Sequence, residues 1–316
     1  MKPNAAHHKL LVVLVLCGIG WGLTVPLAKV AVSDGYQPFG LIFWQMLLSA
    51  GFLSLILLVL RRGLPRKPPH LKIYVIIAVI GTLLPNSASF AASVHLPAGV
   101  MAICLALVPM FAFPVALAMG NDRFGWMKFG GLLCGLVGVL ILTVPDASLP
   151  DPRLAIFILL ALVAPMFYGI EGNYVSKYGP VDLDPIQLLC GSAIIGSVIA
   201  LPLAWFSGQW IDPRGPWAAP DWALVASSLI HASVYSTYFW MVARGGAVFA
   251  AQVSYLVTGF GIVWSILLLG ETYSGWIWLA LVVILGGLTL VQPRAKAPFD
   301  PSGPLAPNSA TGKDGI

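Results

Sequence analysis

The sequence predicts an all-α integral membrane protein, with ten transmembrane helices arranged as two inverted five-helix repeats around a central polar cavity. Three observations predict it: an apolar composition, ten apolar runs and a polar seam that occurs once in each half. The chain of 316 residues is 59% hydrophobic and 9% charged, whereas a soluble domain is about 25% charged. Its mean hydropathy is +0.90. A globular fold cannot enclose so much apolar surface, so we expect membrane lipid around the outer surface.

Each of the ten runs is close to the ~20 residues that cross a hydrocarbon core as a helix. No small-x-small cleavage site follows the first run, so we expect it to be retained as a span. The remaining segments are a cytoplasmic N-terminus (1–9), an outer linker (145–153) between the repeats 10–144 and 154–291, and a disordered cytoplasmic tail (292–316). The runs are Leu10–Val30, Pro38–Leu60, Ile73–Ser93, Ala98–Met119, Gly125–Val144, Leu154–Tyr174, Pro185–Phe206, Asp221–Val242, Ala247–Leu269 and Gly275–Val291.

The basic residues predict the orientation. With ten spans, every Lys and Arg except Lys29, Arg153 and Arg214 lies on the side of the two termini. Cytoplasmic loops carry an excess of Lys and Arg, so both termini are expected in the cytoplasm. The formal net charge of +5 follows this topology and does not indicate a nucleic-acid partner.

A polar seam runs along the eighth run. Ser227, His231, Tyr235 and Tyr238 are spaced by four, four and three residues and therefore share one helix face. Thr82, Asn86 and Ser89 occupy the corresponding positions of the third run, 149 residues before His231, Tyr235 and Tyr238. One seam alone is explained by hydrogen bonds between helices, worth about 0.6 kcal/mol each in membranes. Two seams on related helices favour a central cavity.

Three ionisable residues inside the spans are candidates for function, because charge in a membrane is costly. Glu171 either binds a proton or a substrate amine, or is a structural acid satisfied by water or Lys177. His231 either takes part in a proton-coupled cycle or is a neutral side chain that donates one hydrogen bond across a helix contact. Lys29 either extends to the interface or attracts a substrate carboxylate. The sequence leaves each pair of alternatives open.

Other residue types point to packing rather than chemistry. Cys17, Cys104, Cys134 and Cys190 lie singly in apolar runs, as small packing residues do. The histidines and carboxylates show no metal-ligand spacing, and we expect no metal and no cofactor. The GxxxG pair Gly131/Gly135 and Gly286-Gly287 permit close helix approach, which either braces the repeats or forms a homodimer contact.

The two halves also share short motifs. Gly120, Gly125 and Trp126 match Gly270, Gly275 and Trp276, and Trp21-Gly22 and Pro38 match Tyr168-Gly169 and Pro185. With Lys29, Pro109 and Glu271, these features make residues 10–292 resemble the EamA-type transporters of the drug/metabolite transporter superfamily. The chain departs from that family's usual pattern at Gln45, where Arg is frequent, at Asn121, where Glu is frequent, and at Thr258-Gly259, where the ninth span lacks its proline.

The resemblance implies a ten-helix exporter of amino acids or other small metabolites in a bacterial inner membrane. An odd number of spans in each half inverts the second repeat, which is typical of secondary transporters that work by alternating access. The alternatives are a non-transporting accessory subunit and a membrane-embedded enzyme, which the absence of a nucleophile–base pair disfavours. The expected substrate-binding residues are Trp21, Thr82, Asn86, Ser89, Tyr168, Glu171, His231, Tyr235, Tyr238 and Gln252.

Overall fold

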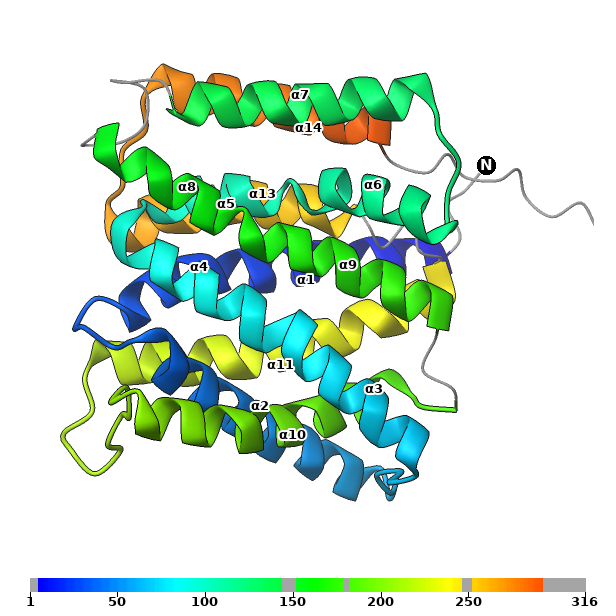
Figure 1. Cartoon of the computed structure of the whole chain (residues 1–316), viewed down its shortest axis with the longest axis vertical. Coiled ribbons are helices and arrows are strands. Elements are labelled where there is room, and N and C mark those ends of the chain that lie inside the picture. The colour runs from blue at the N-terminus through cyan, green and yellow to red at the C-terminus, as the bar shows by residue number, and fades with distance from the viewer. Residues whose placement is uncertain (1–4, 144–151, 179–181, 246–251, 292–316) are drawn as a thin grey trace, which may run out of the picture.

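A computed structural model describes residues 5–143, 152–178, 182–245 and 252–291, and these residues form helices joined by short connections (Figure 1). The predicted N-terminal segment lies partly outside the described residues, the outer linker largely so, and the C-terminal tail entirely so. The helices are α1 (Ala5–Ala31), α2 (Pro38–Val59), α3 (Pro68–Ala78), the π-helical η1 (Val79–Leu83), α4 (Leu84–His95), α5 (Ala98–Leu105), α6 (Val108–Met119), α7 (Trp126–Thr143), the 3-10 turn η2 (Pro152–Leu154), α8 (Ala155–Ala161), α9 (Val163–Tyr178), α10 (Pro185–Phe206), α11 (Ala219–Gly245), α13 (Val253–Leu269) and α14 (Gly275–Val291).

The helices account for ten passes through a membrane. Seven of the described helical segments are long and apolar enough to span a bilayer, counting α3–η1–α4, α5–α6 and α8–α9 as one pass each. The two shorter apolar helices, α13 and α14, have 17 residues each. The tenth pass is α11, which has 27 residues and carries the polar seam along its length.

Proline interrupts three of the passes. A proline clashes with the carbonyl four residues before it and removes one hydrogen bond from the helix. Pro109 follows the end of α5 at Leu105, and Pro165 follows the end of α8 at Ala161. Pro85 lies just after η1, a single π-helical turn of the kind often found at functional sites.

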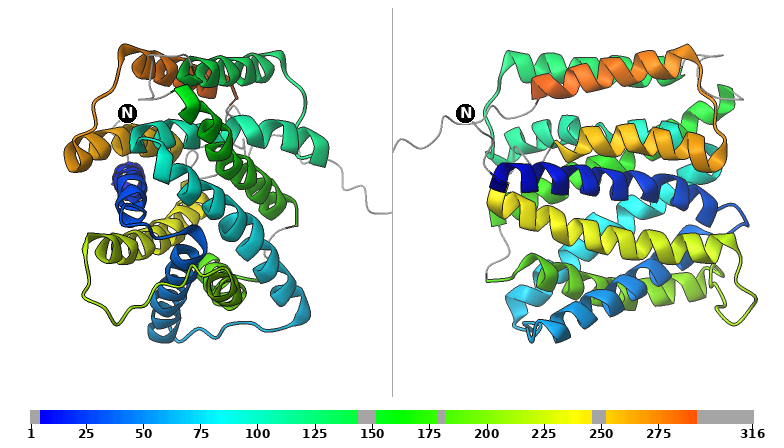
Figure 2. Two further views of the ribbon diagram at one scale, coloured as in Figure 1. Left: turned by 60° about the vertical axis from the view of Figure 1, so that its left-hand side comes forward. Right: turned by 180° about the vertical axis from the view of Figure 1, so that it is seen from behind.

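The packing of the helices repeats between the two halves, and the pairs α7 with α14 and α2 with α10 lie side by side (Figure 2). Helix α1 of the first half packs against α11 and α13 of the second half. Helix α9 of the second half packs against α4 and α6 of the first half, which correspond to α11 and α13. Helices α2 and α10, which correspond to each other, pack together, as do α7 and α14. Exchange of the two halves therefore maps one set of contacts onto the other, as expected for two inverted repeats.

Small residues at equivalent positions bring helices of the two halves close together. A Cβ added at Gly22 would lie 2.8 Å from the backbone nitrogen of Gly261, and one added at Gly169 would lie 2.8 Å from that of Ala112. In α7 a Cβ at Gly131 would lie 2.5 Å from the carbonyl oxygen of Gly287 in α14. Helices α7 and α14 pack along each other (Figure 1), which is the bracing contact that was one of the two alternatives for these glycines.

Charged side chains satisfy helix ends. Lys29 donates from Nζ to the carbonyl oxygens of Ser93 at 2.7 Å and Val94 at 3.1 Å, in the last turn of α4. Glu271 accepts from the backbone nitrogens of Ala98 and Gly99 at the start of α5. The ammonium group of Lys29 thus binds carbonyl oxygens that the end of α4 leaves free. Neither of the two alternatives considered for Lys29 included these carbonyls as its partner.

Candidate functional site

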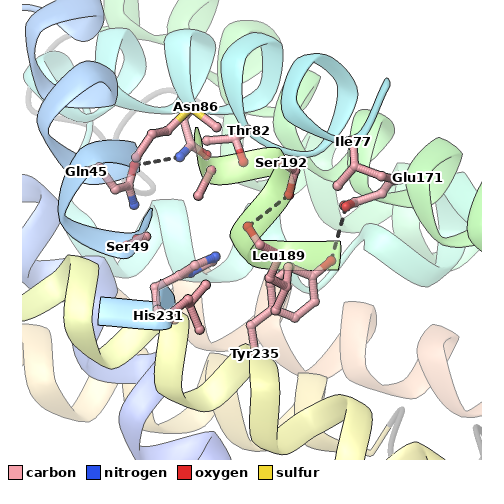
Figure 3. A pocket seen from close by; sticks show the side chains of 14 residues that line it. Gln45, Ser49, Ile77, Thr82, Asn86, Glu171, Leu189, Ser192, His231 and Tyr235 are labelled. Carbon is pink, nitrogen blue, oxygen red and sulfur yellow. Dashed lines mark hydrogen bonds between the residues drawn. The ribbon is translucent and has the colours of Figure 1, made fainter. Parts of the chain in front are cut away.

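A polar cavity of about 40 Å³ lies between the two halves (Figure 3). Both halves supply its walls, through α2 and the α3–η1–α4 pass of the first and α9, α10 and α11 of the second. Its volume corresponds to about three water molecules, so the helices must separate to admit a metabolite. Its lining consists of Gln45, Met46, Ser49, Leu53, Ile77, Thr82, Asn86, Glu171, Leu189, Ser192, Ala193, His231, Ala232 and Tyr235.

A carboxylate lies at one end of this cavity. The side chain of Glu171 on α9 is 5% exposed and accepts a hydrogen bond from the hydroxyl of Tyr235 on α11 at 3.1 Å. The expected alternative partner, Lys177, instead donates from Nζ to the carbonyl oxygen of Met119. The carboxylate packs against Gly81 in η1, where an added Cβ would lie 2.7 Å from Cδ of Glu171.

Two amide side chains lie at the other end of the cavity (Figure 3). Nδ2 of Asn86 on α4 donates to Oε1 of Gln45 on α2 at 2.8 Å. The hydroxyl of Tyr168 on α9 donates to Oδ1 of Asn86 at 2.9 Å. Each amide is therefore oriented by its neighbour, which fixes the atoms that face the cavity.

His231 lies on the wall formed by α11. Its Nδ1 accepts a hydrogen bond from the indole nitrogen of Trp21 on α1 at 3.3 Å. A cross-helix bond was one of the two alternatives for His231, but the imidazole was expected to donate it, and the structure has it accept. The imidazole also lines the cavity, so the bond and a role in binding are compatible. Trp21 packs on three seam residues, with ring centroids 6.1 Å from His231, 5.7 Å from Tyr235 and 5.4 Å from Tyr238.

The structure divides the ten expected binding residues into three groups. Thr82, Asn86, Glu171, His231 and Tyr235 line the cavity. Trp21, Tyr168 and Tyr238 stand behind it as hydrogen-bond donors or packing partners. Ser89 is half-buried one turn further along α4, and Gln252 is exposed at the start of α13; neither lines the cavity.

Three polar lining residues were absent from the expected set: Gln45, Ser49 and Ser192. Helical spacing gives a signal for two of them, because Gln45 and Ser49 are four residues apart and share one face of α2. The internal repeat gives a signal for Ser192, since Gln45 follows Pro38 by the same seven residues by which Ser192 follows Pro185. Within the part of the chain that the structure describes, no cluster of three or more His, Cys, Asp or Glu side chains could hold a metal ion.

The arrangement can bind a polar small molecule between the halves but offers no pair of groups for covalent catalysis. The EamA-like transporter family matches residues 8–144 and again residues 155–292. The chain belongs to the EamA-like transporter family. It is thus a multi-pass membrane transporter of the drug/metabolite type, and not an enzyme.

Relatives agree with this assignment, two of them over most of their length. The transporter YvbV of Bacillus subtilis is 27% identical over 300 residues, covering 93% of this chain and 94% of YvbV. The inner membrane transporter YedA of Escherichia coli is 24% identical, covering 86% of each chain. An S-adenosylmethionine uptake transporter of Rickettsia felis is 27% identical over 34% of each chain. A solved crystal structure with 16% identity covers 88% of this chain and 97% of its own, with a TM-score of 0.62, which shows the shared fold.

Proposed function

We propose that this member of the EamA-like family is a secondary exporter of small metabolites, most plausibly amino acids or their derivatives. The observation that carries the proposal is the cavity between the halves, because it contains a buried carboxylate, Glu171, amid polar groups from both repeats. Secondary transporters with inverted repeats bind substrate near mid-membrane at the repeat interface. Rocking of one half against the other would expose this cavity to each side in turn.

Export is the direction that the family resemblance favours, and uptake is the alternative. The name of the Rickettsia relative adds S-adenosylmethionine to the substrates worth testing.

Flux in proteoliposomes tests the proposal. We would load labelled amino acids and S-adenosylmethionine, with and without an imposed proton gradient, and compare wild type with Glu171→Gln. We expect gradient-dependent flux that is lost in this variant, because a glutamine cannot release a proton. Asp122→Asn is a matched control, since Asp122 pairs with Lys128 outside the cavity. Flux that ignores the gradient and survives the Glu171 substitution would mean facilitated diffusion, and no flux of any compound would reject the proposed substrates.

We further propose that the protein lies in a bacterial inner membrane with both termini in the cytoplasm, and that residues 10–144 and 154–291 are the two repeats. We also propose that a homodimer forms through α7 and α14. Orientation is tested with single cysteines in a variant without native cysteines. An impermeant maleimide should label Gly215→Cys in intact cells but not Gly63→Cys. The reverse pattern would invert the topology. Chemical crosslinking of cysteines placed on α7 tests the dimer.

A further inference from the structure

The hydrogen bonds around the cavity leave donors at one end. The hydroxyl of Tyr168 donates to Oδ1 of Asn86, and Nδ2 of Asn86 donates to Oε1 of Gln45. Both amide oxygens are thus engaged by donors from the protein. Among the described residues, Nε2 of Gln45 donates to no protein acceptor, and its two N–H groups remain for a ligand.

The hydrogen bond from Trp21 makes His231 a donor toward the cavity as well. Since Nδ1 of His231 accepts the indole N–H, the proton of the neutral imidazole is on Nε2. The ring lines the cavity together with Gln45 and Asn86. This part of the site therefore offers uncharged N–H donors that suit an oxygen acceptor.

The other end of the cavity has the opposite character. Glu171 accepts one bond from Tyr235 at Oε1, and its second oxygen remains an acceptor. Figure 3 shows Glu171 and Tyr235 at one end, and Gln45 and Asn86 at the other. Among the described residues, no Lys or Arg lines the cavity, so an ionised Glu171 has no protein cation beside it.

Charge balance then distinguishes the ligands that could bridge the two ends. A zwitterionic amino acid neutralises an ionised Glu171 with its amine, but it adds a carboxylate that meets only neutral donors. An anionic ligand adds charge with no compensation. A cationic amine that carries an uncharged carbonyl satisfies both ends and leaves the buried site neutral. Net charge in low-dielectric surroundings is costly, so the third class is favoured.

We infer that the cavity selects a cationic amine with an uncharged oxygen acceptor, in which the amine binds Glu171 and the oxygen accepts from Gln45 and His231. This inference rests on the proposed transport function and narrows its substrate class to amino acid derivatives whose carboxylate is masked as an amide or ester. It also assigns Gln45 as the residue that recognises the acceptor end.

Four compounds with the same side chain separate the possibilities: L-leucinamide, L-leucine, N-acetyl-L-leucine and isoamylamine. Binding would be measured by thermal shift of the purified, full-length protein, because binding to the folded state raises the unfolding temperature. We expect L-leucinamide to bind at least about tenfold more tightly than L-leucine, which corresponds to about 1.4 kcal/mol. Isoamylamine should bind more weakly than L-leucinamide, and N-acetyl-L-leucine should not bind.

Two variants test which residue binds each end of the ligand. In Glu171→Gln the preference for L-leucinamide over L-leucine should be lost or reversed, because the neutral site no longer balances a cation. In Gln45→Leu the preference for L-leucinamide over isoamylamine should disappear. Ser233→Ala is the control, because Ser233 donates to Leu229 within its own helix and does not line the cavity. Equal or tighter binding of L-leucine, binding of N-acetyl-L-leucine, or binding of none of the four compounds would overturn the inference. Flux of an amine-free metabolite in proteoliposomes would overturn it too, yet leave the proposed transport function standing.

Discussion

The indole nitrogen of Trp21 donates a hydrogen bond to Nδ1 of His231 at 3.3 Å, and the contact joins the first helix of one repeat to the third helix of the other. The second repeat contributes a contact between the corresponding pair of helices, although its acceptor lies one turn beyond Thr82, the residue that corresponds to His231. There Tyr168, which corresponds to Trp21, donates to Asn86 on the third helix of the first repeat. In both contacts a donor behind the cavity engages an acceptor on a lining residue, so the cavity-facing chemistry is set by residues that do not themselves line it.

Replacing Trp21 with Phe should weaken substrate binding more than it weakens the fold. The phenyl ring keeps most of the apolar contact, but Nδ1 of His231 loses its donor and the tautomer is no longer fixed. We expect an increase in KM of about tenfold, equivalent to about 1.4 kcal/mol, and a loss of about 0.6 kcal/mol in stability from the lost interhelical bond. The measurement is flux and thermal unfolding of the same preparation.

Trp264→Phe is the matched control for this experiment. Trp264 on α13 also donates to a neighbouring helix, to the carbonyl oxygen of Ile19 on α1 at 3.2 Å. Unlike His231, the acceptor of Trp21, Ile19 does not line the cavity. The Trp264 variant should lose similar stability with KM unchanged. If both variants alter KM equally, the change in KM in Trp21→Phe reflects lost packing, and the idea that Trp21 orients His231 for binding is wrong.

Gly81 provides the space that the Glu171 carboxylate occupies. A methyl group at residue 81 would lie 2.7 Å from Cδ of Glu171, so Gly81→Ala should displace the carboxylate and lengthen its bond with Tyr235. We expect flux to fall about tenfold or more, because a displacement of about 1 Å in a binding group can cost about 100-fold. The variant should remain folded, since Ala is favoured over Gly in helices by about 1 kcal/mol.

Gly51→Ala in α2 serves as the control for this substitution, because an added Cβ at residue 51 meets no atom within 4 Å. Its flux should match wild type. Unchanged flux in Gly81→Ala would show that the position of the carboxylate is not critical and would weaken the case for Glu171 in transport.

Much of the fold and part of the site could be predicted from the sequence. The apolar runs locate the passes, and prolines such as Pro109 and Pro165 locate their interruptions, because both effects are local. The seam spacing identifies the inward faces of α4 and α11. Spacing does not show how deep in the membrane a residue lies, however, and the seam is longer than the cavity. Ser89 was therefore expected to bind substrate, although it lies beyond the cavity wall. Gln252 was included because it is polar, yet it is exposed at the start of its helix.

The rest depended on tertiary neighbours. Gln45 shares one face of an apolar helix with Ser49, but the packing of α2 against α10 and α11 is what places that face on the cavity. The partner of Lys29 is a set of backbone carbonyls on another helix, which no side-chain pattern reveals. The internal repeat does identify a pair of lining residues from the sequence, because it relates Gln45 to Ser192.

The paired glycine contacts predict where a methyl group will destabilise the protein. Gly22 approaches Gly261, and Gly169 approaches Ala112, and in each pair a Cβ added at the glycine would lie 2.8 Å from the partner's backbone nitrogen. Backbone cannot yield as a flexible side chain can, so Gly22→Ala and Gly169→Ala should each cost about 1–3 kcal/mol through overpacking. Gly172→Ala, on the same helix as Gly169, meets no atom within 4 Å and should be neutral or stabilising by about 0.5–1 kcal/mol.

Reversible unfolding in mixed micelles would measure these differences. Because the two contacts are equivalent under exchange of the repeats, we expect similar losses for Gly22→Ala and Gly169→Ala, and nearly additive losses in the double variant, since the sites share no partner residue. A large loss in only one of the two would mean that the halves do not contribute equally to the interface. A loss in Gly172→Ala equal to that in Gly169→Ala would attribute the effect to the helix itself rather than to its contact with α6.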